Sequence, residues 1–424
     1  MINLQDIIGK RWYMGKGRTP THFEQIDELT IGNASISLVS LRFREGEPDL
    51  YLLIENDDFI GPLLYRALGK TVGSKSFRSK KGIFSFVTYS KFGRDDLESL
   101  KPISAEQSNS SFVAPGKIFF KIFRRLQAGA HPEEEVLRFL NEQGYQGSPE
   151  LLASCHYTGD SGKTFVLGIL EKHIPGAQNA WDVFTREPTA EKAYELGRET
   201  ARMHNALREM DGCEAPSEMP PIEKLRRLLE QNAARFRVGA RNDESGDASG
   251  FPDAARNDEF KSAAGNDELT AVQAILPRLQ KIWTETAPNI SAIFKPQRIH
   301  GDFHLGQVLM TPDARFKMID FEGEPTRSLE FRRGLRSPAV DVAGMIRSFA
   351  YAEAVSKKNM DNVRQAFIQG YAKTANVPED ALQQELKPYI MAKAIYEACY
   401  ELEFRPDWFW IPARALIQLA NPGE

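Results

Sequence analysis

The sequence has few cysteines, no long apolar run and almost no net charge, and each absence excludes a class of protein. The three cysteines, Cys155, Cys213 and Cys399, are odd in number and far apart, which argues against a disulfide framework and favours a reducing compartment. No apolar run approaches the ~20 residues that a membrane-spanning helix needs. With 54 basic and 58 acidic residues, the formal charge of -4 leaves no electrostatic footprint for nucleic acid.

Two short signals are missing as well. Residues 1–18 contain no apolar signal core, so we expect a soluble, cytoplasmic protein. The segment TGDSGKTF ends like a Walker A loop at Gly162, Lys163 and Thr164, but Tyr157 stands where that loop requires its first glycine. With apolar runs on both sides, the segment is predicted to be the turn of a β-hairpin.

What the chain does contain is an acidic centre at residues 297–324, QRIHGDFHLGQVLMTPDARFKMIDFEGE. Two motifs, HGDFHLGQ and MIDFEGE, flank a turn at residues 311–314, and apolar residues lie on both sides of that turn. Pro312 and Asp313 favour the turn, and the pattern predicts a β-hairpin with an acidic group at each end. A surface hairpin with ordinary solvated acids is the alternative.

The spacing of these groups matches the parts that protein kinases use for phosphoryl transfer. There, an Asp of the catalytic loop accepts the hydroxyl proton, an amide five residues later holds one Mg²⁺, and the Asp of a D-F-x motif holds the other. Asp302, Gln307 and Asp320 stand at those places, with Gln for the usual Asn and Asp-Phe-Glu for Asp-Phe-Gly. We therefore predict Asp302 as the catalytic base and Gln307 and Asp320 as metal ligands, with Glu322 assisting the metal.

Two histidines flank the predicted base. His300 and His304 are four residues apart, which raises the possibility of zinc, but the zinc motif of this spacing requires a helix and a Glu. We expect His300 to brace the catalytic loop and assign His304 to the substrate site.

The region before this centre divides by pattern into two parts. Residues 1–100 are predicted to form a separate α+β cap, with strands within 31–43, 47–56 and 82–90 and a helix within 57–69. The basic run 69–82 is predicted to be an exposed loop, and binding of a polyanion is its weaker interpretation because interleaved aromatic residues are missing. Residues 101–174 are predicted to be a nucleotide-binding lobe, with strands within 105–113 and 116–126 followed by a helix within 131–144.

Lys121 lies inside an apolar strand pattern of that lobe, where an unpaired ammonium group would be costly. ATP kinases place a lysine there to hold phosphates and pair with a helix glutamate. Glu135 is the expected partner, while Glu133 and Glu134 stay open as alternatives, and a snorkelling lysine is the structural alternative. Ser108, Asn109 and Ser110 lie where a phosphate-binding loop would stand.

Residues 175–424 are predicted to be mainly helical, interrupted at 238–270 by a polar low-complexity linker in which Asn-Asp-Glu recurs without the spacing of a calcium loop. Pro338 opens a helix in which Asp341 is expected to brace the catalytic loop. The C-terminal segment concentrates aromatic and charged residues of the kind that bind a ring of hydroxyls. Its predicted substrate-binding members are Tyr396, Glu397, Tyr400, Arg405 and Trp408, and a packed amphipathic helix is the alternative.

Several of these segments together resemble bacterial maltokinases. The resemblance is carried by EQSNSSFV, FFKIFRRL, HGDFHLGQVL, IDFEGEP, SPAVDVAGMIRSFAYA and YEACYELEFRPDW, and GKRWYMGKGR resembles the start of that family's cap. It runs almost end to end, with residues 238–270 as a departure. The pair HGDxHxGQ and DFEGEP belongs to this branch of aminoglycoside-phosphotransferase-like kinases, and glucosamine kinases are similar in the same motifs.

The resemblance implies an α+β, bilobal, eukaryotic-protein-kinase-like fold of the aminoglycoside phosphotransferase type with an N-terminal cap. It implies transfer of the γ-phosphate of ATP, with Mg²⁺, to the anomeric hydroxyl of maltose. The product would be maltose 1-phosphate for α-glucan and glycogen synthesis, and a trehalose synthase is a partner by analogy. A kinase for glucosamine, another amino sugar or an aminoglycoside stays open, because Glu397, Glu401 and Glu403 could receive an amino group. A catalytically silent binding module in a glucan-synthesis assembly is the third possibility.

Overall fold

The computed structural model describes residues 4–10, 12–13, 15, 18–54, 60–68, 71–103, 109–215, 220–239, 264–286, 293–325 and 327–421. Ser108 and the centre of the predicted linker, 240–263, lie outside these residues. The chain forms two compact units. The first comprises Met1–Asn179 with Gln307–Arg333, and the second comprises Ala180–Gly306 with Gly334–Glu424. The boundary expected at residue 100 lies inside the first unit.

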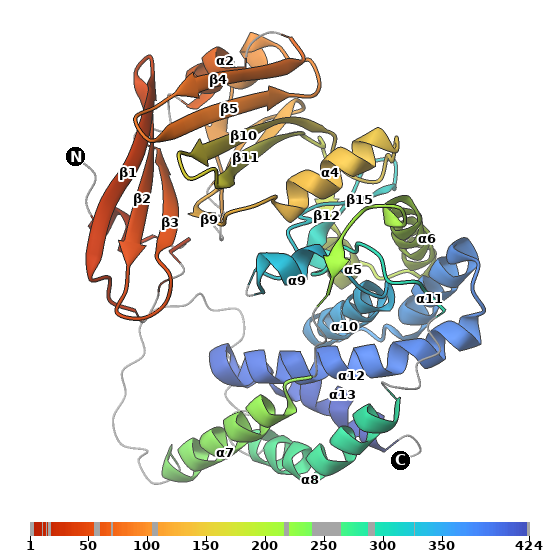
Figure 1. The fold of residues 1–424 in the computed structure, drawn as a ribbon. Coiled ribbons are helices and arrows are strands. Elements are labelled where there is room, and N and C mark those ends of the chain that lie inside the picture. The colour runs from red at the N-terminus through yellow and green to blue at the C-terminus, as the bar shows by residue number, and fades with distance from the viewer. Residues whose placement is uncertain are drawn as a thin grey trace. The chain divides into compact units, whose positions relative to one another are not determined.

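A four-stranded antiparallel sheet begins the first unit (Figure 1). Its order is β1-β2-β3-β9, and its strands are β1 (His22–Ile31), β2 (Ala34–Arg42), β3 (Asp49–Ile54) and β9 (Arg125–Leu126). The short helix α1 (Gln5–Ile8) places Ile7 against Val39 and Leu41 of β2 and Tyr51 of β3, where all four side chains are buried. The early strands expected from the apolar patterns are therefore present.

A seven-stranded antiparallel sheet joins strands from the predicted cap and from the predicted nucleotide-binding lobe. Its order is β4-β5-β10-β11-β8-β7-β6, with β4 (Gly73–Arg78), β5 (Gly82–Thr88), β10 (Leu151–Gly159), β11 (Thr164–Lys172), β8 (Ile118–Phe123), β7 (Asn109–Ala114) and β6 (Lys101–Pro102). Helices α2 (Ile60–Leu68), α3 (Arg94–Glu98) and α4 (Pro132–Glu142) belong to the same unit. The hairpin predicted across Gly162 is the β10–β11 pair.

The basic run 69–82 was expected as a loop, and this expectation was wrong for its central part. Residues 73–78 form β4, which pairs with β5 from Gly73 to Arg78 and stands at the edge of the sheet. Charged side chains are a common way to protect an edge strand from further pairing. The basic side chains of this run therefore fit its place in an edge strand, and the backbone of that strand pairs with β5.

The predicted acidic hairpin is present. Strands β14 (Val308–Met310) and β15 (Phe316–Met318) pair from Val308–Met318 to Met310–Phe316, and β12 (Gln178–Asn179) adds a third strand. The Thr311 amide donates to the Arg315 carbonyl across the turn. Helix α9 (Leu329–Arg333) follows the second acidic motif and ends the first unit.

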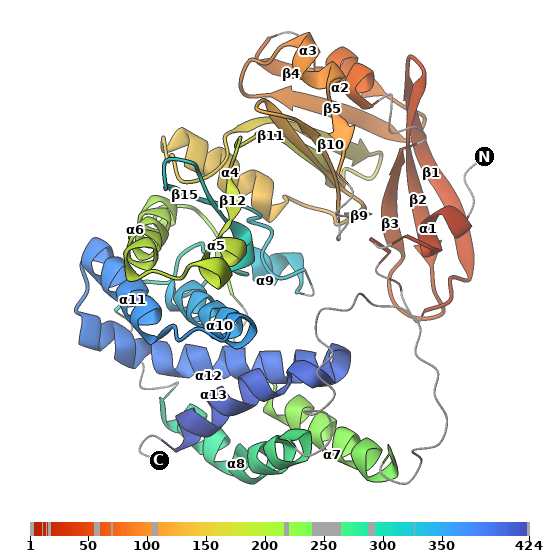
Figure 2. The same ribbon diagram turned by 180° about the vertical axis from the view of Figure 1, so that it is seen from behind.

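The second unit is helical (Figures 1 and 2). It contains α5 (Ala180–Arg186), α6 (Ala190–Leu207), α7 (Ile222–Gly239), α8 (Ala264–Thr286), α10 (Ala339–Ser356), α11 (Asp361–Ala375), α12 (Glu379–Phe404), η5 (Pro406–Trp408) and α13 (Trp410–Ala420), with β13 (Cys213–Glu214) paired to β16 (Gly334–Leu335). The 3₁₀ turn η4 (Leu305–Gln307) leads into β14. Apolar side chains of α7, α8, α12 and α13 form one buried cluster, which anchors α12 from Met391 to Leu402.

No helix in the described part of the chain combines the length and the apolar character that a membrane span requires.

Candidate active site

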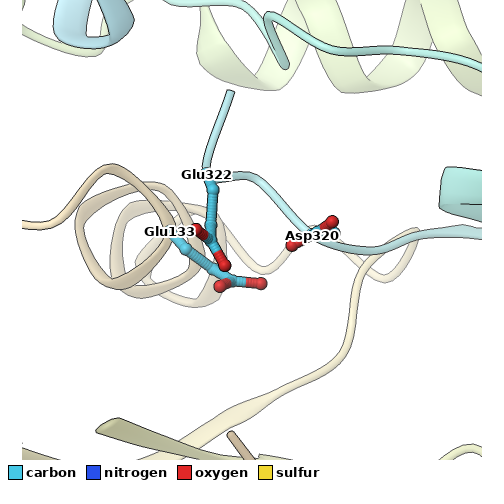
Figure 3. A group of neighbouring side chains, drawn as sticks. All are labelled: Glu133, Asp320 and Glu322. Carbon is cyan, nitrogen blue, oxygen red and sulfur yellow. The ribbon is translucent and has the colours of Figure 1, made fainter. Parts of the chain in front are cut away.

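The first unit contains a cluster of charged side chains, most of them buried. Lys121, on β8, points its ammonium group at three carboxylates: Nζ lies 2.8 Å from Glu133 Oε2 and 2.6 Å from Glu322 Oε1, and it donates a hydrogen bond to Asp320 Oδ1. Glu133 comes from the first turn of α4, and Asp320 and Glu322 follow β15 (Figure 3). Lys121 is 9% exposed and Glu133 only 1%.

This cluster contains three acidic side chains for one lysine. Burial alone would lower the pKa of Lys121, but the charges of Asp320, Glu133 and Glu322 raise it well above its ordinary value. Burial raises the pKa of Glu133 well above normal although Lys121 opposes this. One ammonium group therefore faces three carboxylates, whose oxygens lie within 4.8 Å of one another. Such a set of hard oxygen donors fits a divalent cation such as Mg²⁺.

The expected partner of Lys121, Glu135, was the wrong choice among the three glutamates. Glu135 lies two residues beyond Glu133 on α4, and at 3.6 residues per turn this places it on the other side of the helix. There its carboxylate receives two hydrogen bonds of 2.8 Å from Arg333 of α9. Glu133 is the glutamate that faces Lys121.

The hairpin register explains why the two predicted metal ligands meet. Val308 pairs with Met318, so the residues just outside the hairpin, Gln307 and Ile319, are also opposite each other, and the Ile319 amide donates to the Gln307 carbonyl. Gln307 Nε2 then donates to Asp320 Oδ2 at 2.5 Å. Asp320 has a φ of 66°, a left-handed conformation uncommon for a residue other than glycine.

Of the residues predicted for phosphate binding on β7, Asn109 joins this cluster and Ser110 does not. Asn109 Nδ2 donates to Glu322 Oε1 at 2.6 Å. Ser110 is on the opposite face of the strand, where its buried hydroxyl accepts a hydrogen bond of 2.8 Å from Arg124. The alternation of a β-strand accounts for the difference, since neighbouring side chains point to opposite faces.

A small pocket beside the cluster is lined in part by His131 and Arg332, which the sequence reasoning missed. Asn109, Phe123, His131, Glu322 and Arg332 line it among others. The His131 ring stacks on Phe123 with 3.8 Å between ring centroids. Burial, followed by the charges of Arg332 and Lys121, lowers the pKa of His131 well below its usual range, so this ring is neutral near pH 7. His131 directly precedes the Pro that opens α4, and that position was the available signal.

In the second unit, a buried carboxylate holds the backbone of the HGDFHLGQ loop. Asp341 accepts hydrogen bonds from the amides of His300 at 2.8 Å and Gly301 at 2.9 Å. Its Oδ2 also lies 3.0 Å from His204 Nε2, whose other ring nitrogen lies 2.8 Å from the Tyr371 hydroxyl. Burial would raise the pKa of Asp341, but hydrogen bonds and the charges of His204 and His300 leave it below its ordinary value. The expected contact between Asp341 and this loop is present, and His204 is an addition.

One face of α10 shapes this loop. Positions 341, 344 and 348 are three and four residues apart and therefore share a face of the helix. Next to Asp341, Gly344 lets the Phe303 carbonyl approach so closely that a Cβ there would lie 2.6 Å from its oxygen. Ser348 Oγ accepts a hydrogen bond of 3.0 Å from the Leu305 amide. The loop is thus held by backbone contacts on both sides of Asp302.

The two histidines of the loop turn inward. His300 is buried, and its ring lies against Phe303 with 5.2 Å between centroids, as expected of a residue that supports the loop. His304 Nδ1 accepts a hydrogen bond of 3.0 Å from the Gly306 amide, so this ring nitrogen shapes the turn at η4. Asp302 itself is half-buried.

Helix α12 brings a cation to the predicted base. Lys393 Nζ lies 3.8 Å from Asp302 Oδ1 and 5.3 Å from the centre of the Tyr396 ring. Sequence reasoning missed Lys393. Its spacing was the signal that could have found it, because residues 393, 396, 397 and 400 are three or four apart and share one helical face.

The other predicted substrate-binding residues form a continuous network with α10. Glu397 pairs with Arg347 at 2.8 Å, and Glu401 accepts hydrogen bonds from Tyr351 and Arg405. Trp408 stacks on Tyr351, and Arg405 lies over the rings of Tyr400 and Trp408. Four of the five predicted residues, Glu397, Tyr400, Arg405 and Trp408, therefore belong to one aromatic and charged network of the second unit, in which Tyr400 is exposed. Tyr396 lies instead beside Lys393.

The fold, with a lysine on a strand, a glutamate on the next helix and a short acidic hairpin, defines a kinase-like phosphotransferase. The model of the phosphotransferase enzyme family (APH) matches residues 99–377, and the chain belongs to this family. The glucosamine kinase of Mycolicibacterium smegmatis is 23% identical over 385 residues, covering 86% of this chain and 89% of that protein. The glucosamine kinase of Streptacidiphilus jiangxiensis is also 23% identical, over 368 residues that cover 79% and 76% of the two chains.

A solved glucosamine kinase in crystal form B superimposes with a TM-score of 0.65 at 19% identity and covers 99% of both chains. Another, in complex with glucosamine, ADP and inorganic phosphate, gives a TM-score of 0.63 at the same identity and coverage. The shared fold therefore includes the residues before 99. The predicted fold class and the expectation of a phosphotransferase are both confirmed.

Proposed function

We propose that this phosphotransferase is a sugar kinase that uses ATP and Mg²⁺ to phosphorylate the anomeric hydroxyl of maltose, giving maltose 1-phosphate. The observation that carries the proposal is the grouping of Lys121, Glu133, Asp320 and Glu322, with the Gln307 amide on Asp320. Phosphoryl transfer needs charge and positioning more than covalent chemistry, and this cluster offers both.

In the first unit, Lys121 would hold phosphate oxygens while Glu133 fixes the position of its ammonium group. Asp320 and Glu322, two members of the grouped carboxylates, would hold Mg²⁺ through oxygens that suit it. Gln307, whose amide nitrogen donates to Asp320, would add its side-chain oxygen. Bound there, the ion would neutralise charge on the phosphates. Asn109 holds Glu322 from β7 and thereby orders the cluster.

In the second unit, Asp302 would orient the acceptor hydroxyl and take its proton. The new bond forms between that oxygen and the γ-phosphorus, and the bond to the β–γ bridging oxygen breaks, so that ADP leaves with the electron pair. Asp341 contributes indirectly by fixing the backbone on which Asp302 stands.

The assignment to maltose rests on the surface of α12 and η5 and on the resemblance of YEACYELEFRPDW to maltokinases. Flat aromatic faces with carboxylate and guanidinium groups suit the hydroxyls and ring faces of a sugar. In this segment Arg405 lies over the Trp408 ring, and Lys393 lies over the Tyr396 ring. Maltose 1-phosphate would serve α-glucan synthesis, and a trehalose synthase is the partner we propose by analogy.

Glucosamine kinase is the second candidate, favoured by the two relatives of that name. A silent binding module is a poorer account of the cluster, because binding alone does not require two metal-facing groups beside a phosphate-binding lysine.

A coupled assay of ADP release separates these candidates. The panel contains maltose, glucose, glucosamine and an aminoglycoside, with a blank that lacks acceptor and a parallel series in EDTA. We expect release that depends on Mg²⁺ and is fastest with maltose. Fastest release with glucosamine would select the second candidate, and ATP binding without release on any acceptor would support the binding module.

A further inference from the structure

We propose that Lys393 selects the charge of the acceptor, favouring a neutral carbohydrate over one that carries an ammonium group beside the reacting hydroxyl. The inference rests on the proposed sugar kinase function and specifies its substrate class.

Lys393 lies close to Asp302 without forming a hydrogen bond to its carboxylate. Its Nζ lies 3.8 Å from Asp302 Oδ1, beyond hydrogen-bond distance, so the carboxylate keeps its lone pairs for a hydroxyl. The side chains are 31% and 25% exposed, and both can therefore meet an acceptor from solvent. The Tyr396 ring, 5.3 Å away, holds the ammonium group near that approach.

Carboxylates that could receive an amino group are already paired with cations. Glu397 pairs with Arg347, which is buried beside it. Glu401 accepts from Arg405, and Glu403 lies 2.7 Å from Lys224. Each of these three acids of α12 thus has a cation beside it.

The cation that lies at Asp302 is Lys393. An acceptor that places its hydroxyl on Asp302 places the substituent of the neighbouring carbon close to Nζ as well. A hydroxyl there accepts a hydrogen bond from the ammonium group. An ammonium group there meets a like charge, which selects strongly against a ligand. A neutral pyranose satisfies both side chains, whereas a protonated amino sugar satisfies only Asp302.

The test compares kcat/KM for maltose, glucose and glucosamine in the wild type and in Lys393→Gln, Lys393→Met and Lys393→Arg. Glucose and glucosamine differ only in the substituent beside the anomeric carbon. We expect both neutral variants to raise the ratio of glucosamine to glucose by about tenfold or more. Lys393→Arg keeps the charge and the wild-type ratio. Lys387→Gln, an exposed lysine of the same helix, is the matched control and leaves the ratio unchanged.

A pH series adds a readout that a purely structural role would not move. A sugar amine, like an α-amino group with an ordinary pKa of about 8, loses its proton within the assay range. Wild-type activity on glucosamine should therefore rise with pH relative to glucose, and Lys393→Gln should flatten that rise.

Two results would overturn the inference while leaving a sugar kinase in place: a wild type that prefers glucosamine, or neutral variants that lose activity equally on all sugars. In the second case Lys393 only positions Asp302. Absence of sugar-dependent ADP release in the wild type would overturn the proposed function itself, and the inference with it.

Discussion

The two compact units differ in how their charged side chains are grouped and exposed. The first gathers Glu133, Asp320 and Glu322 around one buried lysine and leaves negative charge in excess. In the second unit the Asp302 side chain is partly exposed, and its loop is held because backbone amides donate hydrogen bonds to the buried Asp341. The difference matches the roles that we propose: grouped carboxylates around a lysine suit the binding of cations and phosphates, whereas a proton acceptor needs a rigid support and access to the acceptor.

The largest expected effect falls on the open carboxylate. Asp302→Asn removes the proton acceptor but keeps the shape, so turnover should fall by about a thousandfold while nucleotide affinity stays within about twofold. Steady-state ADP release and equilibrium ATP binding measure the two quantities. Asp313→Asn, in the exposed hairpin turn, is the control. Turnover near that of the wild type would remove Asp302 from its role.

Asp341→Asn should come next, because it disturbs a buried acceptor of several hydrogen bonds. We expect a loss of about 3 kcal/mol in the free energy of unfolding, measured with denaturant. Asp380→Asn, exposed on α12, should change it by less than about 0.5 kcal/mol. A loss as small as that of the control would show that the loop does not depend on Asp341.

The pH dependence of the free energy of unfolding should also report on Asp341. The pKa of Asp341 in the folded protein lies below its ordinary 3.8, so its stabilising contribution is complete above that value and is lost as pH falls through the lower folded pKa. The stability of Asp341→Asn should therefore depend less on pH in this acid range.

The two glutamates of α4 provide a finer comparison. Glu133→Gln should raise the KM for ATP about tenfold, because it removes a charged partner from the phosphate-binding lysine. Glu135→Gln breaks the pair with Arg333, away from Lys121, and should leave that KM within about twofold. Equal effects of the two changes would contradict the assignment of Glu133.

The smallest expected effect concerns Glu171, buried near the first cluster. Burial raises its pKa to about 7, with Lys121 opposing and Asp320 and Glu322 adding to the rise. Its contribution to stability is complete below the ordinary value of 4.5 and is lost as pH rises through about 7. Glu171→Gln should therefore unfold with about 1 kcal/mol less dependence on pH between 6 and 8, whereas exposed Glu142→Gln should follow the wild type.

The sequence predicted features that depend on local order. The acidic hairpin follows from turn residues and strand patterns, and its register brings Gln307 to Asp320 without any long-range information. Asp341 was found because it opens a helix. The interval between acidic motifs carried the kinase-like assignment.

It was harder to predict which face of a helix or strand a side chain lies on, and which distant residues it contacts. Glu133 and Glu135 differ only by their angle on α4, and the choice depends on Lys121 and Arg333 elsewhere in the chain. Residue 110 faces away from the cluster for the same reason on a strand. The contacts of Lys393 and His204 with Asp302 and Asp341 depend on how separate helices pack, although the helical spacing of residue 393 was a signal for that lysine.

The face of α10 formed by residues 341, 344 and 348 limits how this enzyme could change. Any side chain at position 344 would push against the Phe303 carbonyl and displace the neighbouring base, so that loop has little freedom to vary. Specificity for new acceptors would instead have to arise through α12, which brings Lys393 to within 3.8 Å of Asp302. Laboratory selection for altered sugars should therefore collect its substitutions on α12 and spare the glycine.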